Sequence, residues 1–100
     1  MGDRIAELLQ QAAAMAANAD GTSLWRAYVA VEYAILDLKL RYGLEGQPPP
    51  PALKRTAKKE DLVAAAKEGF ARLDVNGDRK KLLYDLRACR DALKAALAKA

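Results

Sequence analysis

Two carboxylates on one predicted helix, Glu32 and Asp37, are the side chains whose type and spacing first suggest acid–base chemistry. Residues five apart on a helix point in different directions, so the two do not form a catalytic pair. Glu32 lies within a broad apolar face, where we expect a buried carboxylate bonded to a Tyr or Arg of a neighbouring helix. Cys89, the one cysteine, has no histidine anywhere in the chain to activate it. We therefore identify no catalytic residues and predict that the protein is not an enzyme.

The segment between residues 74 and 85 has some of the spacing of a calcium loop. The side chains at positions one, three, five and twelve of that loop are Asp74, Asn76, Asp78 and Asp85. In this respect the segment resembles EF-hand and dockerin loops, which place oxygen ligands at these positions. It departs from them at position six, where Arg79 replaces glycine, and at position eight, where Lys81 replaces an apolar residue. We therefore favour a turn in which Asp78 caps the next helix, and expect neither a metal nor another cofactor.

The basic residues are concentrated in the C-terminal half of the chain. Residues 1–47 carry four Lys and Arg against six acids, a net charge of −2, and residues 48–100 carry 13 against seven, a net charge of +6. The candidate binding residues are Lys54, Arg55, Lys58, Lys59, Arg79, Lys80, Lys81, Arg87 and Arg90. They could attract a nucleic acid or an acidic partner. No aromatic residue is interleaved with the two main clusters, which argues against a base-stacking surface, and a solvated face is the alternative.

The elements that carry these residues are helices. Of the 52% hydrophobic positions in this 100-residue chain, 22 residues are Ala and 15 are Leu, with few aromatics, which favours helices over a sheet. Apolar residues at steps of three and four predict helices over about 3–18, 24–42, 57–73 and 79–98. A proline-rich connection, 45–52, joins the second helix to the third. It predicts a stiff crossover, or alternatively a docking site for a proline-binding module. We expect an all-α single domain, 1–100: a four-helix up-and-down bundle.

The second predicted helix carries apolar residues around more of its circumference than one neighbour can cover. One seam contains Leu24, Tyr28, Val31, Ile35, Leu38 and Tyr42, and a second stripe contains Trp25, Val29, Leu36 and Leu40. Such a helix lies either at the centre of the bundle or at a subunit interface. We predict an interface, and hence a homodimer, formed by Leu24, Trp25, Tyr28, Val29, Leu36 and Leu40. Gly43 is expected to end the helix in a left-handed conformation, with Leu44 packing back onto it.

Composition limits the compartment and the class of protein. A single cysteine gives no disulfide framework, and the absence of histidine excludes a Cys/His zinc site. The first residues show no signal-peptide pattern, and charges interrupt the most apolar stretch, so we expect no membrane partner and a cytoplasmic location. The scarcity of Asn and Gln, with many charges, is typical of thermophile proteins.

The segment from Trp25 to Gly43, the proline-rich connection and the following pair of Leu-rich helices together resemble the HEPN superfamily of small helical bundles. The resemblance spans about residues 22–95 and rests on an Ala-Tyr-x-Ala-x-Glu-x-Ala-like pattern in the second helix. Arg90 and Asp91 could be the Arg and polar residue of HEPN ribonucleases. The histidine of that motif would fall at positions 95–97, which are Ala95, Ala96 and Leu97. The resemblance thus implies a non-catalytic member that dimerises and binds a nucleic acid, a nucleotide or a protein.

The sequence therefore leads to two expected functions. The first is a non-enzymatic helical interaction or assembly module that self-associates or binds a protein partner. The second is a nucleic-acid-associated protein that uses the basic C-terminal half.

Overall fold

The computed structural model of the chain describes residues 3–16, 18, 20–44, 46–48, 50, 57–74 and 76–99, with the side chains of residues 3–5 left out. These residues form four α-helices and no strand: α1 (Asp3–Ala16), α2 (Gly21–Tyr42), α3 (Lys59–Arg72) and α4 (Arg79–Ala98). Within the described ranges, the predicted all-α four-helix fold is confirmed.

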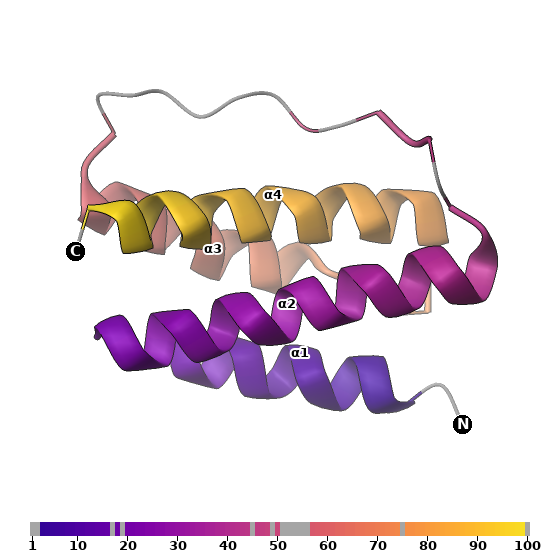
Figure 1. Cartoon of the computed structure of the whole chain (residues 1–100), viewed down its shortest axis with the longest axis horizontal. Coiled ribbons are helices and arrows are strands. Elements are labelled where there is room, and N and C mark those ends of the chain that lie inside the picture. The colour runs from indigo at the N-terminus through magenta and orange to yellow at the C-terminus, as the bar shows by residue number, and fades with distance from the viewer. Residues whose placement is uncertain are drawn as a thin grey trace.

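The helices are arranged as two antiparallel hairpins, α1–α2 and α3–α4, and α2 packs against α4 where the hairpins meet (Figure 1). The end of α2 and the start of α3 lie at opposite ends of the bundle, so α3 starts at the end where α2 also starts. As a result α2 and α3 run in the same direction. The expected up-and-down order, in which every helix reverses the direction of the previous one, is therefore wrong at this step, because the long connection allows a crossover.

The core lies between the two hairpins and consists of Leu, Val and Ala side chains. Leu24, Leu38, Leu83, Leu86, Leu93 and Val31 are the large aliphatic side chains with almost no exposed surface. Among the described residues no polar or charged side chain is buried. Fully buried alanines on facing sides of α1 and α2, such as Ala12 and Ala27, let these two helices approach closely.

Side-chain caps determine where α2 begins. The Asp20 carboxylate accepts hydrogen bonds from the Ser23 backbone N–H (2.8 Å) and from the Ser23 hydroxyl (2.9 Å). These bonds lower the pKa of Asp20. The predicted start of this helix at about Leu24 is wrong, because Asp20 caps a helix that starts at Gly21.

Two other predicted helix ends are confirmed. Gly43 has φ +63°, and the N–H groups of Gly43 and Leu44 both donate to the Lys39 carbonyl while Leu44 is buried. Asp78 caps α4 by accepting from the Lys80 N–H (2.9 Å). The predicted third helix is too long, since α3 begins after Lys58, which provides no side-chain cap, and ends at Arg72.

The loop before α4 has the turn geometry expected from the sequence. Asp74 accepts from the Asn76 N–H through its side chain (3.1 Å) and from the Gly77 N–H through its carbonyl (3.2 Å). Asp85, the twelfth position of the calcium-like pattern, pairs instead with Lys81 on α4 (3.3 Å). These acidic groups thus bond to backbone N–H groups and to a lysine of the same segment.

Gly69 lies where α3 packs tightly against Cys89 of α4. A Cβ atom at this position would lie 2.5 Å from the Cys89 sulfur, which is buried in the core. Burial raises the pKa of the Cys89 thiol to about 12. Cys89 is thus a buried thiol with little thiolate character, and Gly69 is required by packing despite its low helix propensity.

We predict that Gly69→Ala destabilises the protein by about 1–2 kcal/mol, because overpacking against Cys89 exceeds the gain in helix propensity of about 1 kcal/mol. In a Cys89→Ala background the same substitution should become stabilising. The measurement is a double-mutant cycle of urea unfolding. Additive effects of the two substitutions would contradict this explanation of Gly69.

Candidate functional site

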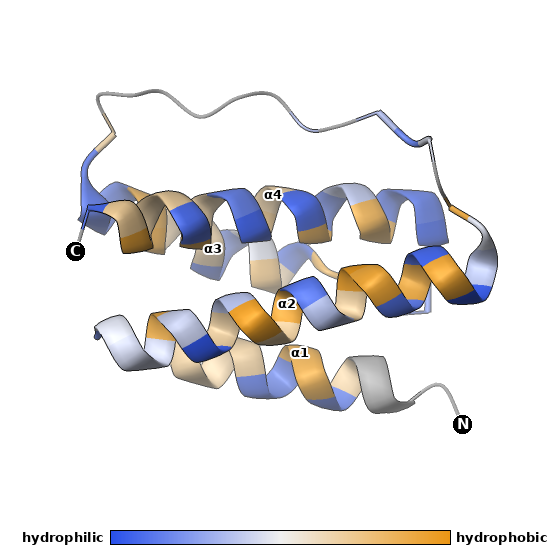
Figure 2. Ribbon diagram, in the orientation of Figure 1, coloured by the Kyte–Doolittle hydropathy of each residue, from blue (hydrophilic) through white to orange (hydrophobic). Residues whose placement is uncertain are grey.

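The outer face of α2 exposes five large hydrophobic side chains. Their exposed fractions are 55% for Trp25, 45% for Val29, 49% for Tyr33, 54% for Leu36 and 71% for Leu40. We call these five residues the outer stripe. The hydropathy-coloured ribbon shows apolar positions interleaved with polar ones along α2 (Figure 2). The outer stripe is therefore accessible to a partner along most of the helix.

The spacing of the outer stripe is that of a coiled-coil seam. Val29, Tyr33, Leu36 and Leu40 follow one another at steps of four, three and four residues. Three of these positions were predicted from the sequence, and Tyr33 was not. The heptad spacing could have identified it, because Tyr33 lies four residues after Val29 and three before Leu36.

Two residues of the predicted interface are not part of the outer stripe. Leu24 is fully buried, because it lies on the inner side of α2 and packs within the core of the protomer. Its assignment to an interface is therefore wrong. Tyr28 is half-buried beside α4, with its ring 5.6 Å from that of Trp25. The predicted residues Trp25, Val29, Leu36 and Leu40 are the exposed ones.

A polar network borders the outer stripe on the side of α4. Glu32 accepts a hydrogen bond from the Tyr28 hydroxyl (3.3 Å) and pairs with Arg90 on α4 (3.3 Å). Arg90 also contacts Asp91 (3.2 Å). Glu32 thus has an Arg partner on a neighbouring helix, as expected from the sequence, whereas Tyr28 lies on the same helix as Glu32. The predicted burial of Glu32 is wrong, because 41% of its side chain is exposed at the edge of the helix face.

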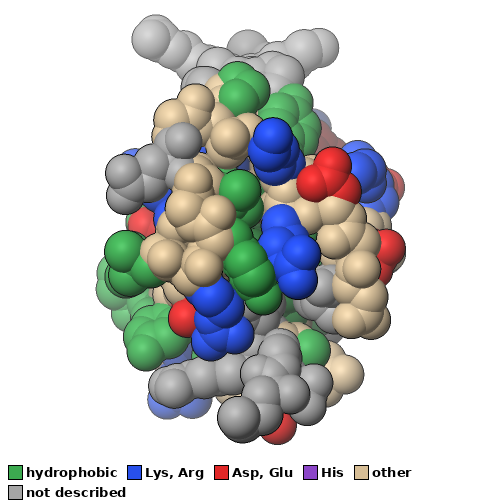
Figure 3. Space-filling view, turned by 90° about the vertical axis from the view of Figure 1, so that its right-hand side faces the viewer, with side chains coloured by type: hydrophobic (Ala, Val, Ile, Leu, Met, Phe, Trp, Pro, Cys, Tyr) green, Lys and Arg blue, Asp and Glu red, His purple; other side chains and the backbone are tan. Residues whose placement is uncertain are grey.

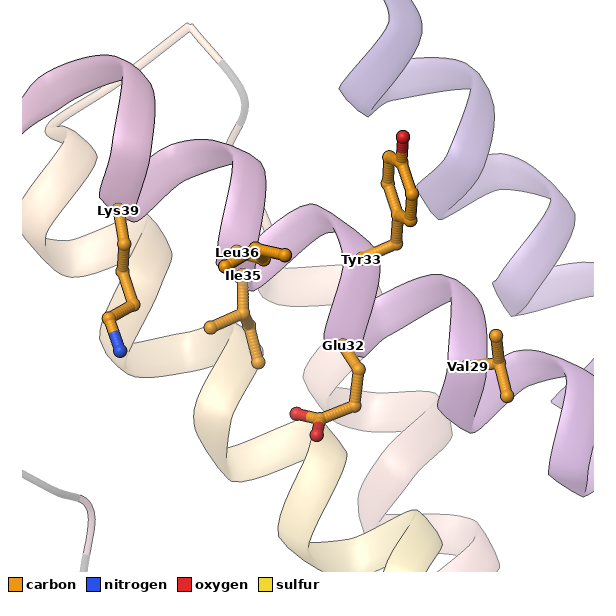
Figure 4. Close-up of a pocket in the computed structure, with 6 residues that line it drawn as sticks. All are labelled: Val29, Glu32, Tyr33, Ile35, Leu36 and Lys39. Carbon is orange, nitrogen blue, oxygen red and sulfur yellow. The ribbon is translucent and has the colours of Figure 1, made fainter.

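A shallow depression of about 430 Å³ lies along this border (Figure 4). It is lined by Val29, Glu32, Tyr33, Ile35, Leu36 and Lys39. Glu32 and Lys39 extend toward the same side, with α4 beneath them, whereas Tyr33 points to the other side of α2. The candidate site therefore combines an apolar stripe with one carboxylate and one ammonium group on the same flank.

The candidate basic residues do not gather at one place. Lys54 and Arg55 lie outside the described residues. Lys58 and Lys59 stand at the start of α3, and the cluster Arg79, Lys80 and Lys81 stands at the start of α4, at the opposite end of the bundle (Figure 1). The α3–α4 hairpin thus separates the two clusters.

Several of these cations have partners within the protein. The Arg79 guanidinium lies 4.1 Å from the centre of the Tyr42 ring, and Arg87 donates to the Gln47 carbonyl (2.9 Å). On the end of the bundle seen in Figure 3, Lys and Arg side chains alternate with acidic and hydrophobic ones. Nucleic-acid binding stays a prediction, and this arrangement does not favour a continuous surface for a polyanion.

The described residues show no cluster of metal-ligating side chains and no helix that could span a membrane. No group of three or more Cys, Asp and Glu side chains in these ranges is placed to hold a metal ion. None of the four described helices has the length and apolar composition of a membrane span. The outer stripe with its charged flank is the site that the described part of the chain presents most clearly.

The chain shows no detectable similarity to known proteins in any of the three comparisons. No protein-family model, curated protein or solved structure matches it. The HEPN resemblance therefore stays a prediction, and the function has to be argued from the site.

The polar contacts on either side of α2 predict the order in which two tyrosines ionise. Desolvation and the nearby Glu32 carboxylate raise the pKa of Tyr28, whereas a hydrogen bond from Arg79 lowers the pKa of Tyr42. We expect Tyr42 to lose its proton first as the pH rises through 10, and Glu32→Gln to lower the pKa of Tyr28. Titration of the tyrosine ring carbons by NMR measures both values.

The raised pKa of Tyr28 also determines how this residue's contribution to the free energy of unfolding changes with pH. The neutral form of Tyr28 is favoured in the folded protein, so its contribution is complete below its unfolded pKa and is lost as the pH rises through the raised folded value. A Tyr28 that ionises before Tyr42 would contradict the network described above.

Proposed function

We propose that this protein is a non-enzymatic assembly module that forms a homodimer through the outer stripe of α2. The observation that supports the proposal is the exposure of five large hydrophobic side chains on one face of one helix. Surface hydrophobic residues are common singly, but a contiguous row on a small protein is typical of an interaction site.

The outer stripe is not needed to hold the bundle together. The inner side of α2 already provides the core contacts through residues such as Leu24, Val31 and Leu38, which are almost completely buried. Polar side chains at the outer positions would leave that core intact and would keep the helix soluble. The apolar residues are therefore best explained by a contact with another molecule.

The exposed area is sufficient for a dimer of modest size. A large side chain buries about 150–250 Å² when covered, so five half-exposed ones present on the order of 500 Å². Two copies face to face would bury about 1,000 Å², the lower limit for a specific interface. The flanking charged residues would add to this area.

The HEPN-like resemblance and the cytoplasmic location expected from the sequence are compatible with this proposal. A non-catalytic HEPN-like bundle in the cytoplasm would suit a module that works by self-association. The dimer is argued from the outer stripe alone and does not depend on that resemblance.

We predict that Leu36→Asp converts the protein to a monomer at micromolar concentrations, because the substitution places a charge at the centre of the apolar interface. Sedimentation velocity measures the change in mass, and circular dichroism checks that the helices remain. Wild-type protein that sediments as a monomer up to about 100 µM, that is, with a dissociation free energy below about 5.5 kcal/mol, would refute the proposed function.

A matched pair of tyrosine variants provides the control. Tyr33 and Tyr84 are 49% and 39% exposed, but Tyr33 is part of the outer stripe and Tyr84 lies on α4. We expect Tyr33→Ser to weaken dimerisation about tenfold or more and Tyr84→Ser to leave it unchanged, since a truncated aromatic at an interface costs more than 1 kcal/mol. Equal effects of the two variants would place the interface elsewhere.

A further inference from the structure

The positions of the charged residues beside the outer stripe indicate in which orientation the α2 helices of two copies would pair. If Val29 and Leu36 are d positions of a heptad, Tyr33 and Leu40 are a positions. Between Val29 and Leu40, Glu32 and Lys39 then take the g positions, and Ala30 and Asp37 take the e positions. Residues at e and g border the seam in a coiled coil and determine the orientation of the partner helix.

A parallel pairing of two α2 helices would be electrostatically unfavourable. In that arrangement each g residue faces the e residue of the next heptad on the other helix, so Glu32 would face the partner subunit's Asp37. Symmetry repeats this contact between like charges on the other side of the dimer. Asp37 pairs with Arg41 within its own protomer (3.4 Å), but no attractive pair between the subunits compensates, because position 44, which Lys39 would face, lies beyond the end of α2 at Tyr42.

An antiparallel pairing brings opposite charges together instead. The g positions then face each other, so Glu32 lies opposite the partner subunit's Lys39, and symmetry makes the same pair a second time. Asp37 faces the partner subunit's Ala30, which has no charge. The apolar layers are complementary too, since Val29 meets the partner subunit's Leu40 and Tyr33 meets the partner subunit's Leu36.

The structure places both charged groups where this pairing needs them. Glu32 and Lys39 extend to the same flank of α2, over the depression that borders the outer stripe (Figure 4). The contacts with Tyr28 and Arg90 fix the position of the Glu32 carboxylate but leave 41% of the side chain exposed. Each carboxylate oxygen has a further lone pair for a lysine. Within the described residues no acidic group lies at ion-pair distance from Lys39.

We infer that α2 of one protomer packs antiparallel against α2 of a second copy, about a two-fold axis between Ala34 and Ile35, with Glu32 facing the partner subunit's Lys39. The inference rests on the proposed function and adds the orientation and register of the dimer. The interface is isologous, so both copies use the same surface and the assembly closes at two subunits.

Cysteine cross-linking tests the orientation directly. Val29→Cys and Leu40→Cys are prepared as separate proteins, oxidised alone and then as a mixture, with wild-type protein as the control for buried Cys89. Positions 29 and 40 lie about 16 Å apart along a helix, at 1.5 Å per residue. Disulfides need Cα atoms within about 7 Å, so the mixture should give on the order of ten times more linked dimer than either variant alone.

The possible outcomes separate the two proposals. Efficient linkage within each single variant would show a parallel dimer and overturn the inference while leaving the proposed function intact. A stable wild-type dimer in which neither the variants nor their mixture link would place the interface elsewhere and overturn both. A monomeric wild-type protein in sedimentation would also overturn both.

A charge exchange tests the register without cysteines. In the antiparallel pairing, Glu32→Lys and Lys39→Glu each place like charges opposite one another and should weaken dimerisation several-fold, and the double variant should restore it. A parallel pairing predicts the opposite for Glu32→Lys, which would remove the repulsion with the partner subunit's Asp37. Because the double variant still lacks the Glu32–Arg90 contact, restored dimerisation would exclude a purely structural effect, and failure to restore it would contradict the register.

Discussion

Burial of the inner side of α2 holds the two hairpins together. Its aliphatic residues pack against α1 within their own hairpin and against α4 across the bundle, whereas α1 and α3 meet only slightly. Since no described polar side chain is buried, these contacts provide cohesion through apolar area rather than through specific bonds. The relative orientation of the helices therefore has to be determined by contacts at their ends and edges. The Asp20 and Asp78 caps start two helices, and the Glu32–Arg90 pair joins α2 to α4 at the rim of the core.

The elements of the bundle could be predicted where a local signal determines them. Asp78 and Gly43 mark helix ends through their own side chain or backbone conformation, and both ends were found from the sequence. The start of α2 was missed because Gly21, Thr22 and Ser23 have the composition of a turn, and only the bonds from Ser23 to Asp20 make them helical. The crossover direction could not be predicted, because a long connection can return along the bundle or reverse at its end.

The candidate site was partly predictable for a related reason. A periodic pattern indicates which residues share a face but not which neighbour covers that face. Leu24 and Leu40 are both large apolar residues of α2, yet one is fully buried and the other is 71% exposed. Their difference depends on the placement of α1 and α4. Glu32 shows the same limit: its partners were expected by residue type, whereas its exposure depends on the distance of α4 from the edge of the helix.

The same features explain how a simple apolar stripe could be specific. Apolar burial favours any partner that covers the surface, so the outer stripe alone would not select an orientation. Charges at the border of an interface act mainly on register and on the rejection of wrong partners. Glu32 is well suited to this role, because Arg90 and Tyr28 restrict its side chain before a partner arrives and so reduce the entropy lost on binding. The contact that joins the hairpins inside one protomer would therefore also prepare the surface by which two protomers recognise each other.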